Sequence, residues 1–519
     1  MLINYMKLFI VIIIAISFFQ TKLVFSQMQF DWVRVYNGIF TGGEDAAQSI
    51  FIDYQGNILV TGGSQNGSST YACVTIKYNQ SGDILWTKEY YRLGNFIGSD
   101  IHSDDSGNVF IANGAIIKYD IKGNLIFDSY DSVAYYRVLL DPSGNIYGGG
   151  IRLGKLTVGK YNKNGNRIWR KEYSFSGSAG VDRFGGFTKD KSGNLIITGR
   201  SKSNTTFYDY ATLKYSNDGD LLWSRRYNGP SSTSFDDAEG VTTDIFGNIY
   251  VTGTSMDSLN HYNCTTIKYD SKGNVIWLKR IPADNFIADI GYNIRTDSSQ
   301  NVFIAGRLEG RTTIIKLDIN GNVLWYRVYS EGSLITNNFP VIVLDSVFNI
   351  YTTAISTATG GADYAAIKYD SSGNQIYTVT YNNSSYDYVY DLALGKYGDI
   401  YLTGEFSANG WGYGTVKFTP IITGISENEI KTYNYKLEQN YPNPFNPTTK
   451  INYQLSMFSN VSLKVYDVLG HEVKTLVNEN KPAGRYEVTF NEADFPSGIY
   501  FYKLETESYI QTRRMILLK

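Results

Sequence analysis

The chain has few cysteine, histidine and charged residues for its length of 519, and each shortage excludes a class of protein. Two Cys cannot form a disulfide scaffold, and three His cannot supply zinc fingers or a multi-histidine metal centre. Charged residues are only 18% of the chain, and 47 Lys and Arg balance 49 Asp and Glu. The basic surplus typical of a nucleic-acid-binding protein is therefore missing, and no nucleic-acid partner is expected.

Aromatic residues and glycine are abundant instead. Phe, Trp and Tyr make up 15% of the chain, with 44 Tyr, and 50 residues are Gly. Aromatic side chains favour strands, and glycine favours tight turns. The composition therefore predicts an all-β protein of many short strands, and the length predicts more than one domain.

The first 26 residues have the pattern of a leader. Lys7 precedes an apolar run over 8–19, which is shorter than the roughly 20 residues that span a bilayer. Val24 and Ser26 then precede Gln27 as at a cleavage site. We predict a signal peptide over 1–26, with an uncleaved anchor or a buried helix as the alternatives. The exported chain would carry no other transmembrane segment.

A repeat of about 49 residues runs from residue 30 to 418. One signature is a turn of the type Asp-x-x-Gly-Asn followed by an apolar strand, as in DYQGNILVTGG from residue 53. The other is a strand ending in Lys-aromatic, a Gly turn and a strand with Trp, as in VTIKYNQSGDILWTKEY from residue 74. Each unit then holds four short strands, which is typical of a propeller blade. The last turn residue recurs at Asn57, Asn108, Asn145, Asn194, Asn248, Asn301, Asn349 and Asp399.

The two ends of the repeat region complement each other. The last copy stops at 414–418 without its Trp strand, and the first residues of the region supply Trp32 and Tyr36 at the usual spacing. We expect this N-terminal strand to pair with the strand containing Lys417. Residues 27–418 would then form an eight-bladed β-propeller closed as a ring, with a stacked solenoid as the alternative.

The unit resembles the β-propeller repeat of exported bacterial proteins, the SBBP-type repeat. That family implies the fold and no shared chemistry. Propellers with recurrent Trp also resemble pyrroloquinoline-quinone dehydrogenases, which commonly use adjacent Cys, whereas Cys73 and Cys264 are far apart here. We expect the Trp side chains to pack between blades, and the two thiols to be free and half-buried.

Residues 435–519 contain short strands separated by Pro, Gly and Asn turns, which predict a small Ig-like β-sandwich. They resemble the C-terminal type A sorting domain of the type IX secretion system. Arg513 and Arg514 stand where that family usually has two Lys. The other matching positions are Asn440, Pro442, Asn443, Pro444, Asn446, Pro447, Gly470, Gly484, Gly498 and Tyr500.

This second resemblance implies a route and partners. The chain would pass through the periplasm and cross the outer membrane by the type IX secretion machinery, and a sortase would remove the tail or attach the protein to the surface. We expect processing in the polar linker 419–434. The predicted location is therefore secreted or attached to the outer surface.

No catalytic or cofactor-binding residues are predicted. One Asp recurs twelve residues before the turn, and this set could form an acidic rim that holds calcium or a basic ligand. Its symmetric recurrence favours the alternative, in which the side chain caps a turn between blades. The members are Asp45, Asp182, Asp236, Asp289 and Asp387.

The sequence therefore favours a monomeric binding or interaction protein that presents loops and Tyr side chains to a glycan, protein or small ligand. An extracellular hydrolase or lyase acting on polysaccharide is the alternative, with two carboxylates drawn from different blades. A structural surface protein without a specific ligand is the third hypothesis.

Overall fold

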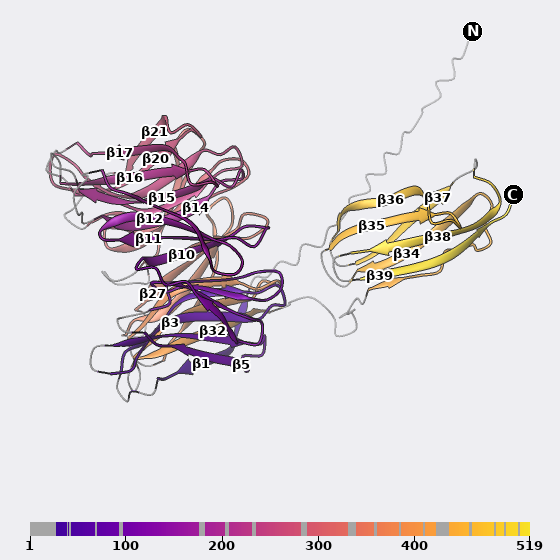
Figure 1. Ribbon diagram of the computed structural model, residues 1–519, viewed down its shortest axis with the longest axis horizontal. Helices are drawn as coiled ribbons and strands as arrows, with labels where there is room; N and C mark the ends of the chain where they lie inside the picture. The colour runs from indigo at the N-terminus through magenta and orange to yellow at the C-terminus, as the bar shows by residue number, and fades with distance from the viewer. Residues whose placement is uncertain are drawn as a thin grey trace, which may run out of the picture. The chain divides into compact units, whose positions relative to one another are not determined.

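The computed structural model divides the chain into two compact units, unit 1 over residues 1–421 and unit 2 over 422–519 (Figure 1). The predicted leader and most of the predicted linker lie outside the described residues. No helix in the described part of the chain is long and apolar enough to cross a membrane. The structure describes residues 27–38, 40, 43–67, 70–92, 97–175, 182–202, 207–230, 235–281, 288–330, 339–357, 361–383, 386–407, 411–421, 435–455, 459–481, 484–491, 495–506 and 509–519.

All the described secondary structure is β, as the composition predicts. In unit 1 the described strands form eight four-stranded antiparallel sheets, an arrangement consistent with a propeller. In strand order the sheets are β2 (Asp45–Ile52), β3 (Ile58–Gln65), β4 (Tyr71–Tyr78), β5 (Ile84–Tyr90); β6 (Asp100–Ser103), β7 (Val109–Ala112), β8 (Ile116–Tyr119), β9 (Leu125–Asp128); β10 (Ala134–Leu140), β11 (Ile146–Arg152), β12 (Lys155–Tyr161), β13 (Arg167–Tyr173); β14 (Arg183–Lys189), β15 (Leu195–Lys202), β16 (Tyr208–Tyr215), β17 (Leu221–Tyr227); β18 (Asp236–Thr243), β19 (Ile249–Met256), β20 (Tyr262–Tyr269), β21 (Val275–Ile281); β22 (Ile290–Thr296), β23 (Val302–Leu308), β24 (Arg311–Leu317), β25 (Val323–Val328); β26 (Ile342–Leu344), β27 (Ile350–Ser356), β28 (Asp363–Tyr369), β29 (Gln375–Tyr381); and β30 (Asp387–Leu394), β31 (Ile400–Phe406), β32 (Gly412–Pro420), β1 (Met28–Tyr36).

The first strand of each sheet, which we call the inner strand, contacts the inner strands of both neighbouring sheets. The contacts run in order through β2, β6, β10, β14, β18, β22, β26 and β30, and β30 contacts β2 again. The second and third strands are buried on both faces, because adjacent sheets pack against them. One sheet therefore covers the next around a common centre.

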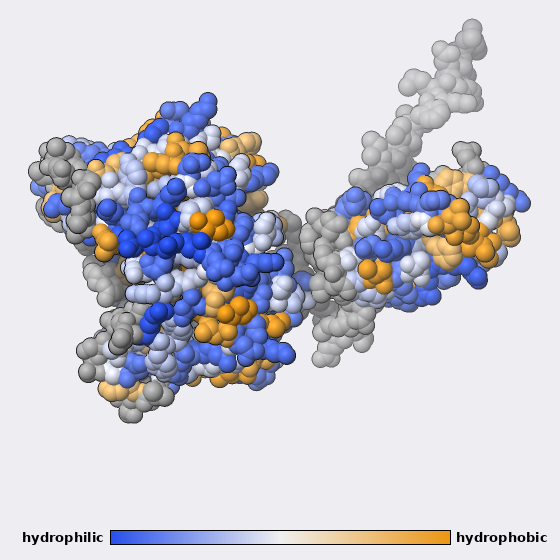
Figure 2. Space-filling model, viewed as in Figure 1, coloured by the Kyte–Doolittle hydropathy of each residue, from blue (hydrophilic) through white to orange (hydrophobic). Residues whose placement is uncertain are grey.

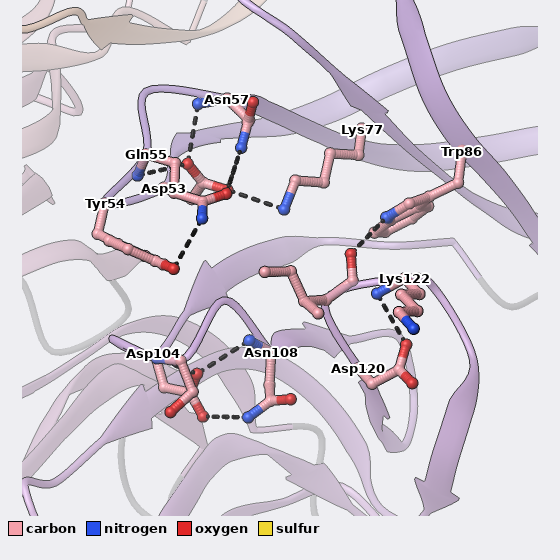
Figure 3. Close-up of polar contacts among 12 residues, drawn as sticks. Asp53, Tyr54, Gln55, Asn57, Lys77, Trp86, Asp104, Asn108, Asp120 and Lys122 are labelled. Carbon is pink, nitrogen blue, oxygen red and sulfur yellow. Dashed lines mark hydrogen bonds and ion pairs between the residues drawn. The ribbon is translucent and has the colours of Figure 1, made fainter.

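The Asp-x-x-Gly-Asn turn is held by its own side chains (Figure 3). Asp53 accepts hydrogen bonds from the backbone N–H groups of Gln55 (2.9 Å) and Asn57 (2.8 Å) and from the Asn57 amide (2.9 Å). Gly56 has φ +82°, a conformation that glycine adopts without strain. Lys77 of β4 forms a buried ion pair with Asp53 at 2.9 Å. The turn thus anchors the Lys of the Lys-aromatic signature.

The recurrent Lys and Trp clamp several sheets to the next one. Trp223 lies opposite Lys214, and both donate to the carbonyl oxygen of Ser271 in the following sheet, at 3.1 and 3.3 Å. Trp277 and Lys268 make the same pair of contacts with Ile319. Figure 3 shows the related bond from Trp86 to the turn that contains Asp120. The Trp residues therefore pack between sheets, as the sequence predicts.

The last sheet joins the two ends of unit 1. β1 pairs antiparallel with β32, and Trp32 lies opposite Lys417. Trp32 Nε1 and Lys417 Nζ donate to the carbonyl oxygen of Gln80 in the first sheet, at 3.1 and 3.2 Å. The contact between the last and first sheets therefore repeats the clamp found between other neighbours, with Tyr36 at the end of the same strand.

Unit 2 contains two antiparallel sheets over one core. Side chains from both sheets, among them Ile451, Leu463 and Tyr502, pack into a single apolar cluster. Two sheets packed face to face form a β-sandwich; its Ig-like character stays a prediction. The three-stranded sheet comprises β33 (Lys436–Leu437), β34 (Thr448–Leu455) and β37 (Gly484–Asn491), and the four-stranded sheet comprises β36 (Glu472–Lys481), β35 (Ser459–Tyr466), β38 (Gly498–Glu505) and β39 (Ile510–Leu517).

Candidate functional site

A cavity of about 530 Å³ lies where the inner strands meet, and each of the eight inner strands contributes to its lining. A second cavity of about 480 Å³ shares Ser99, Arg137, Gly185 and Glu239 with the first. Volumes in this range are typical of small-molecule sites. The central cavity is therefore the candidate functional site of unit 1. In the view of Figure 2, charged and polar residues cover most of the coloured surface of unit 1.

A β-bulge turns consecutive side chains of the inner strands toward the cavity. The register of β22 with β23 shifts between Gly291 and Asn293, so Tyr292 is the extra residue and lines the cavity beside Asn293. Bulges of this kind re-aim side chains and are common at functional sites. The same shift occurs in β2, β10, β14, β18 and β30.

The lining does not repeat from sheet to sheet. The position eight residues before each turn residue changes in chemistry around the cavity, and seven of its eight occupants line the cavity. Unlike the turn, this position breaks the repeat symmetry. The occupants are Ser49, Asp100, Arg137, Gly186, Gly240, Asn293, Val341 and Asp391.

This position was not predicted from the sequence, because its residue type does not recur. It lies eight residues before the last turn residue of each repeat, and the change of residue type there from repeat to repeat is the signal that could have identified it. The five predicted Asp residues lie twelve residues before the turn residue instead, where the residue type recurs.

The carboxylates of the cavity already have partners. Asp100 accepts from Arg137 (3.1 Å) and from the backbone N–H of Val138 (2.8 Å). Burial opposes its charge, but His102 and Arg137 outweigh burial and lower the pKa of Asp100. Asp391 accepts from the Ser49 hydroxyl and two backbone N–H groups, while burial raises its pKa.

A second charged cluster lies where the two cavities join. The Arg183 guanidinium donates to Asp237 (2.6 Å) and to both oxygens of Glu239 (2.6 and 3.1 Å). Arg200 also pairs with Asp237, at 3.1 Å. Burial, followed by repulsion from Asp237, raises the pKa of Glu239 to about 7 despite the attraction of Arg183. Glu239 is thus a half-buried acid whose pKa is raised toward neutral pH.

Replacing Glu239 with Gln should change how stability depends on pH. The folded state holds a proton on Glu239 up to a pKa of about 7, whereas the ordinary pKa is 4.5. Between these values the folded state binds more protons than the unfolded state, so the free energy of unfolding of the wild type falls as the pH rises. The wild type should lose about 1–3 kcal/mol relative to E239Q between pH 5 and pH 8, measured by urea denaturation.

The exposed Glu309 offers a matched control. E309Q should track the wild type at both pH values. A difference between wild type and E239Q that does not vary with pH would contradict the titration of Glu239 near neutrality.

Aromatic pairs line the same region. Tyr136, at the bulge of β10, stacks on Phe184 with ring centroids 5.5 Å apart, and both line the second cavity. Tyr292 packs edge-on against Phe339 at 5.0 Å, and both line the central cavity. Aromatic faces beside polar groups suit flat, hydroxyl-rich ligands.

The five predicted Asp residues do not line the central cavity, although Asp182 lines the second one. Each is at most 7% exposed and accepts hydrogen bonds from groups four to twenty residues away in the sequence. The capping role stays a prediction. A calcium role stays a prediction. Asp45 accepts from the N–H groups of Gly38 and Gln65, Asp236 from Gly229 and Met256, Asp387 from Asn383 and Ser407, Asp289 from Glu309, and Asp182 from the Ser201 hydroxyl.

The two cysteines are free, but the prediction that they are half-buried was wrong. Cys73 is 1% and Cys264 0% exposed. Each lies on the third strand of its sheet, which neighbouring sheets cover on both faces. Burial raises the pKa of both thiols, that of Cys264 to about 12.

In unit 2 the structure brings the first and last sorting motifs together. Asn443 accepts from the backbone N–H of Ile516 at 2.9 Å, and its amide donates to the carbonyl oxygen of Arg514. Asn440 is buried and donates to the Pro442 carbonyl oxygen and Thr449. The segment with Pro444, Asn446 and Pro447 leads directly into β34, and Phe445 bridges to β39.

The remaining motif positions are spread over unit 2. Gly470 has φ +85° in the turn between β35 and β36, and Gly484 and Gly498 begin β37 and β38. The Tyr500 hydroxyl donates to the Pro496 carbonyl oxygen at 3.0 Å. Arg513 donates to the carbonyl oxygen of Leu437, and Arg514 is exposed.

Comparison with known families identifies both kinds of unit. Residues 439–518 match the secretion system C-terminal sorting domain, and residues 222–258 match the β-propeller repeat, which confirms both resemblances. The sorting domain marks proteins that the type IX system exports to the cell surface or extracellular space. The chain is therefore an exported protein with propeller repeats, and its tail interacts with the secretion machinery.

More distant similarities are also found, and the one to Sqt1 agrees with the fold. The chain is 23% identical over 410 residues to an uncharacterized WD repeat-containing protein of Acanthamoeba polyphaga mimivirus, covering 73% of this chain but only 25% of that relative. The crystal structure of Sqt1 from Chaetomium thermophilum is similar with TM-score 0.52 and 8% identity, over 75% of this chain and 99% of that one. PorZ of Porphyromonas gingivalis, a surface component of the type IX secretion system, is 12% identical with TM-score 0.33, over 91% and 74% of the two chains.

Proposed function

We propose that residues 27–418 form a closed eight-bladed propeller that is secreted or held on the cell surface and binds a ligand in its central cavity. The inner strands contact one another in a cycle, and the clamp between the last and first sheets matches the others; both observations support closure. A leader over 1–26, a processed linker over 419–434 and a sortase that acts on the 435–519 domain complete the proposal, and the protein acts as a monomer.

The binding role rests on one observation, the loss of repeat symmetry at the cavity. A scaffold role requires similar contacts from sheet to sheet, which the recurrent turns and, between several sheets, the Lys–Trp clamps provide. A ligand site requires particular groups in particular places, since function is added to a fold at a site. Contacts with the neighbouring inner strand account for Asp100, Arg137 and Asp391. A bound ligand would account for Asn293, whose buried Oδ1 has no hydrogen-bond partner among the described residues.

A hydrolase or lyase is the second candidate, because of Glu239. A carboxyl group whose pKa is raised to about 7 is suited to donate or accept a proton near neutral pH. Its two bonds to Arg183 favour a role in the structure or in binding instead.

A glycan array and an activity screen on the purified exported protein test the two candidates. Binding without turnover is expected, and turnover of a bound polysaccharide that E239Q abolishes would favour the enzyme. Failure to bind any glycan, protein or small molecule tested would leave only the role of a structural surface protein.

A further inference from the structure

The central cavity contains one cation without a matching anion. Arg295 lines it from β22, and its one hydrogen bond to the described residues goes from Nη1 to the carbonyl oxygen of Ile294, at 2.9 Å. No carboxylate among the described residues lies within ion-pair distance of it. Arg137, by contrast, pairs with Asp100, and Arg183 pairs with Asp237 and Glu239. A guanidinium has five N–H donors, so most of those of Arg295 remain available.

The surroundings of Arg295 favour an added negative charge. Burial, together with repulsion from Arg137, lowers the pKa of Arg295, and the attraction of Asp391 only partly compensates. Asp391 itself accepts hydrogen bonds from Ser49, Ile50 and Leu392, so its oxygens are occupied. An anion beside Arg295 would relieve this repulsion and use the free donors.

An unpartnered acceptor lies two residues away on the same strand. Asn293 Oδ1 is buried, lines the cavity and has no hydrogen-bond partner in the part of the chain that the structure describes. A buried polar atom without a partner is costly, and a ligand hydroxyl would satisfy it. Tyr292 of the same strand and Phe339 add aromatic surface to the lining. Cation, hydroxyl acceptor and aromatic faces therefore lie together on one side of the cavity.

We infer that the cavity binds a carboxylate-bearing sugar, with the carboxylate on Arg295, a ring hydroxyl on Asn293 Oδ1 and the sugar ring near Tyr292. This inference rests on the proposed binding function and names its ligand class. A neutral sugar would leave Arg295 unpaired, and a small inorganic anion would leave Asn293 and the aromatic faces unused.

Calorimetric titration of the purified exported protein tests the inference. The probes are trimers of galacturonate and glucuronate, the neutral trimers of galactose and glucose, and inorganic sulfate. An acidic trimer should bind the wild type at least about tenfold more tightly than its neutral counterpart and sulfate. R295M should bind it at least about tenfold more weakly, while R311M, which removes an exposed Arg of β24, should bind it like the wild type. Binding should also weaken as salt is added.

Thermal melting distinguishes a loss of ligand binding by R295M from misfolding of the variant. Arg295 has no ion pair to lose, so R295M should melt with the wild type, and N293A should weaken binding without unfolding the protein. Equal binding by wild type and R295M, equal binding of sulfate, or no acidic trimer bound more tightly than about 1 mM would overturn the inference. If another ligand still binds, the binding function stands and only this inference fails; if nothing binds, both fail.

Discussion

Deletion of β1, residues Met28–Tyr36, is expected to abolish the cooperative unfolding of unit 1. The deletion removes the whole ladder with β32 and exposes the hydrogen-bonding edge of that strand. It also removes Trp32, which is 6% exposed and packs between Tyr78 and Tyr401. The first and last sheets then lose their clamp on Gln80. Circular dichroism melts and urea denaturation would measure the loss.

Two point variants on β1 make this test specific. W32A should lower the free energy of unfolding by about 3–5 kcal/mol, the usual cost of removing a buried Trp side chain. Val35 lies three residues along the same strand and is 49% exposed, so V35A should change it by less than about 0.5 kcal/mol.

Adding a synthetic peptide of residues 27–37 to the deleted protein should restore the melt, because the peptide supplies the missing strand. A deleted protein that melts like the wild type without the peptide would show that β1 does not close unit 1.

Truncation after Ile421 is expected to end export while leaving unit 1 folded. The chain separates into two units at this point, and the truncation removes the whole sorting match over 439–518. In a host with the type IX system the shortened protein should accumulate in the periplasm, measured by cell fractionation, with the melting behaviour of unit 1. Its appearance outside the cell at the wild-type level would contradict the role of the tail.

The converse experiment tests sufficiency. A reporter that has its own signal peptide should reach the outside of the cell when fused to residues 419–519. R513Q/R514Q should reduce its export, since both Arg lie on β39 within the sorting match. K450Q removes an exposed Lys of β34 in the same unit and should leave export unchanged.

The repeated features of the fold could be predicted because they are local. Asn57 donates hydrogen bonds to Asp53 within a segment of five residues, so this turn can be recognised from the local sequence. The Lys and Trp of the clamp lie on neighbouring strands of one repeat, and their repetition revealed them, whereas their shared bond to the following sheet was not predicted. The incomplete copy at 414–418 pointed to Trp32 for the same reason.

The cavity could not be predicted in this way. Its lining depends on a β-bulge that no particular residue type indicates in the sequence. It also depends on side chains such as Arg137 and Arg295, which come from separate repeats. The burial of Cys73 was underestimated for a related reason, since a strand pattern does not show that both faces of a sheet are covered.

The sheet built from both ends of unit 1 has a consequence for biogenesis. A chain that crosses the inner membrane from its N-terminus delivers β1 first and β32 nearly last, so the final sheet must wait for the whole repeat region. Loop closure costs grow only slowly with length, so the delay is kinetic rather than energetic, and pairings so distant in sequence form slowly. During that interval β1 lacks its partner strand and has open edges. The yield of exported protein should therefore depend on periplasmic chaperones that shield such edges until the sheet forms.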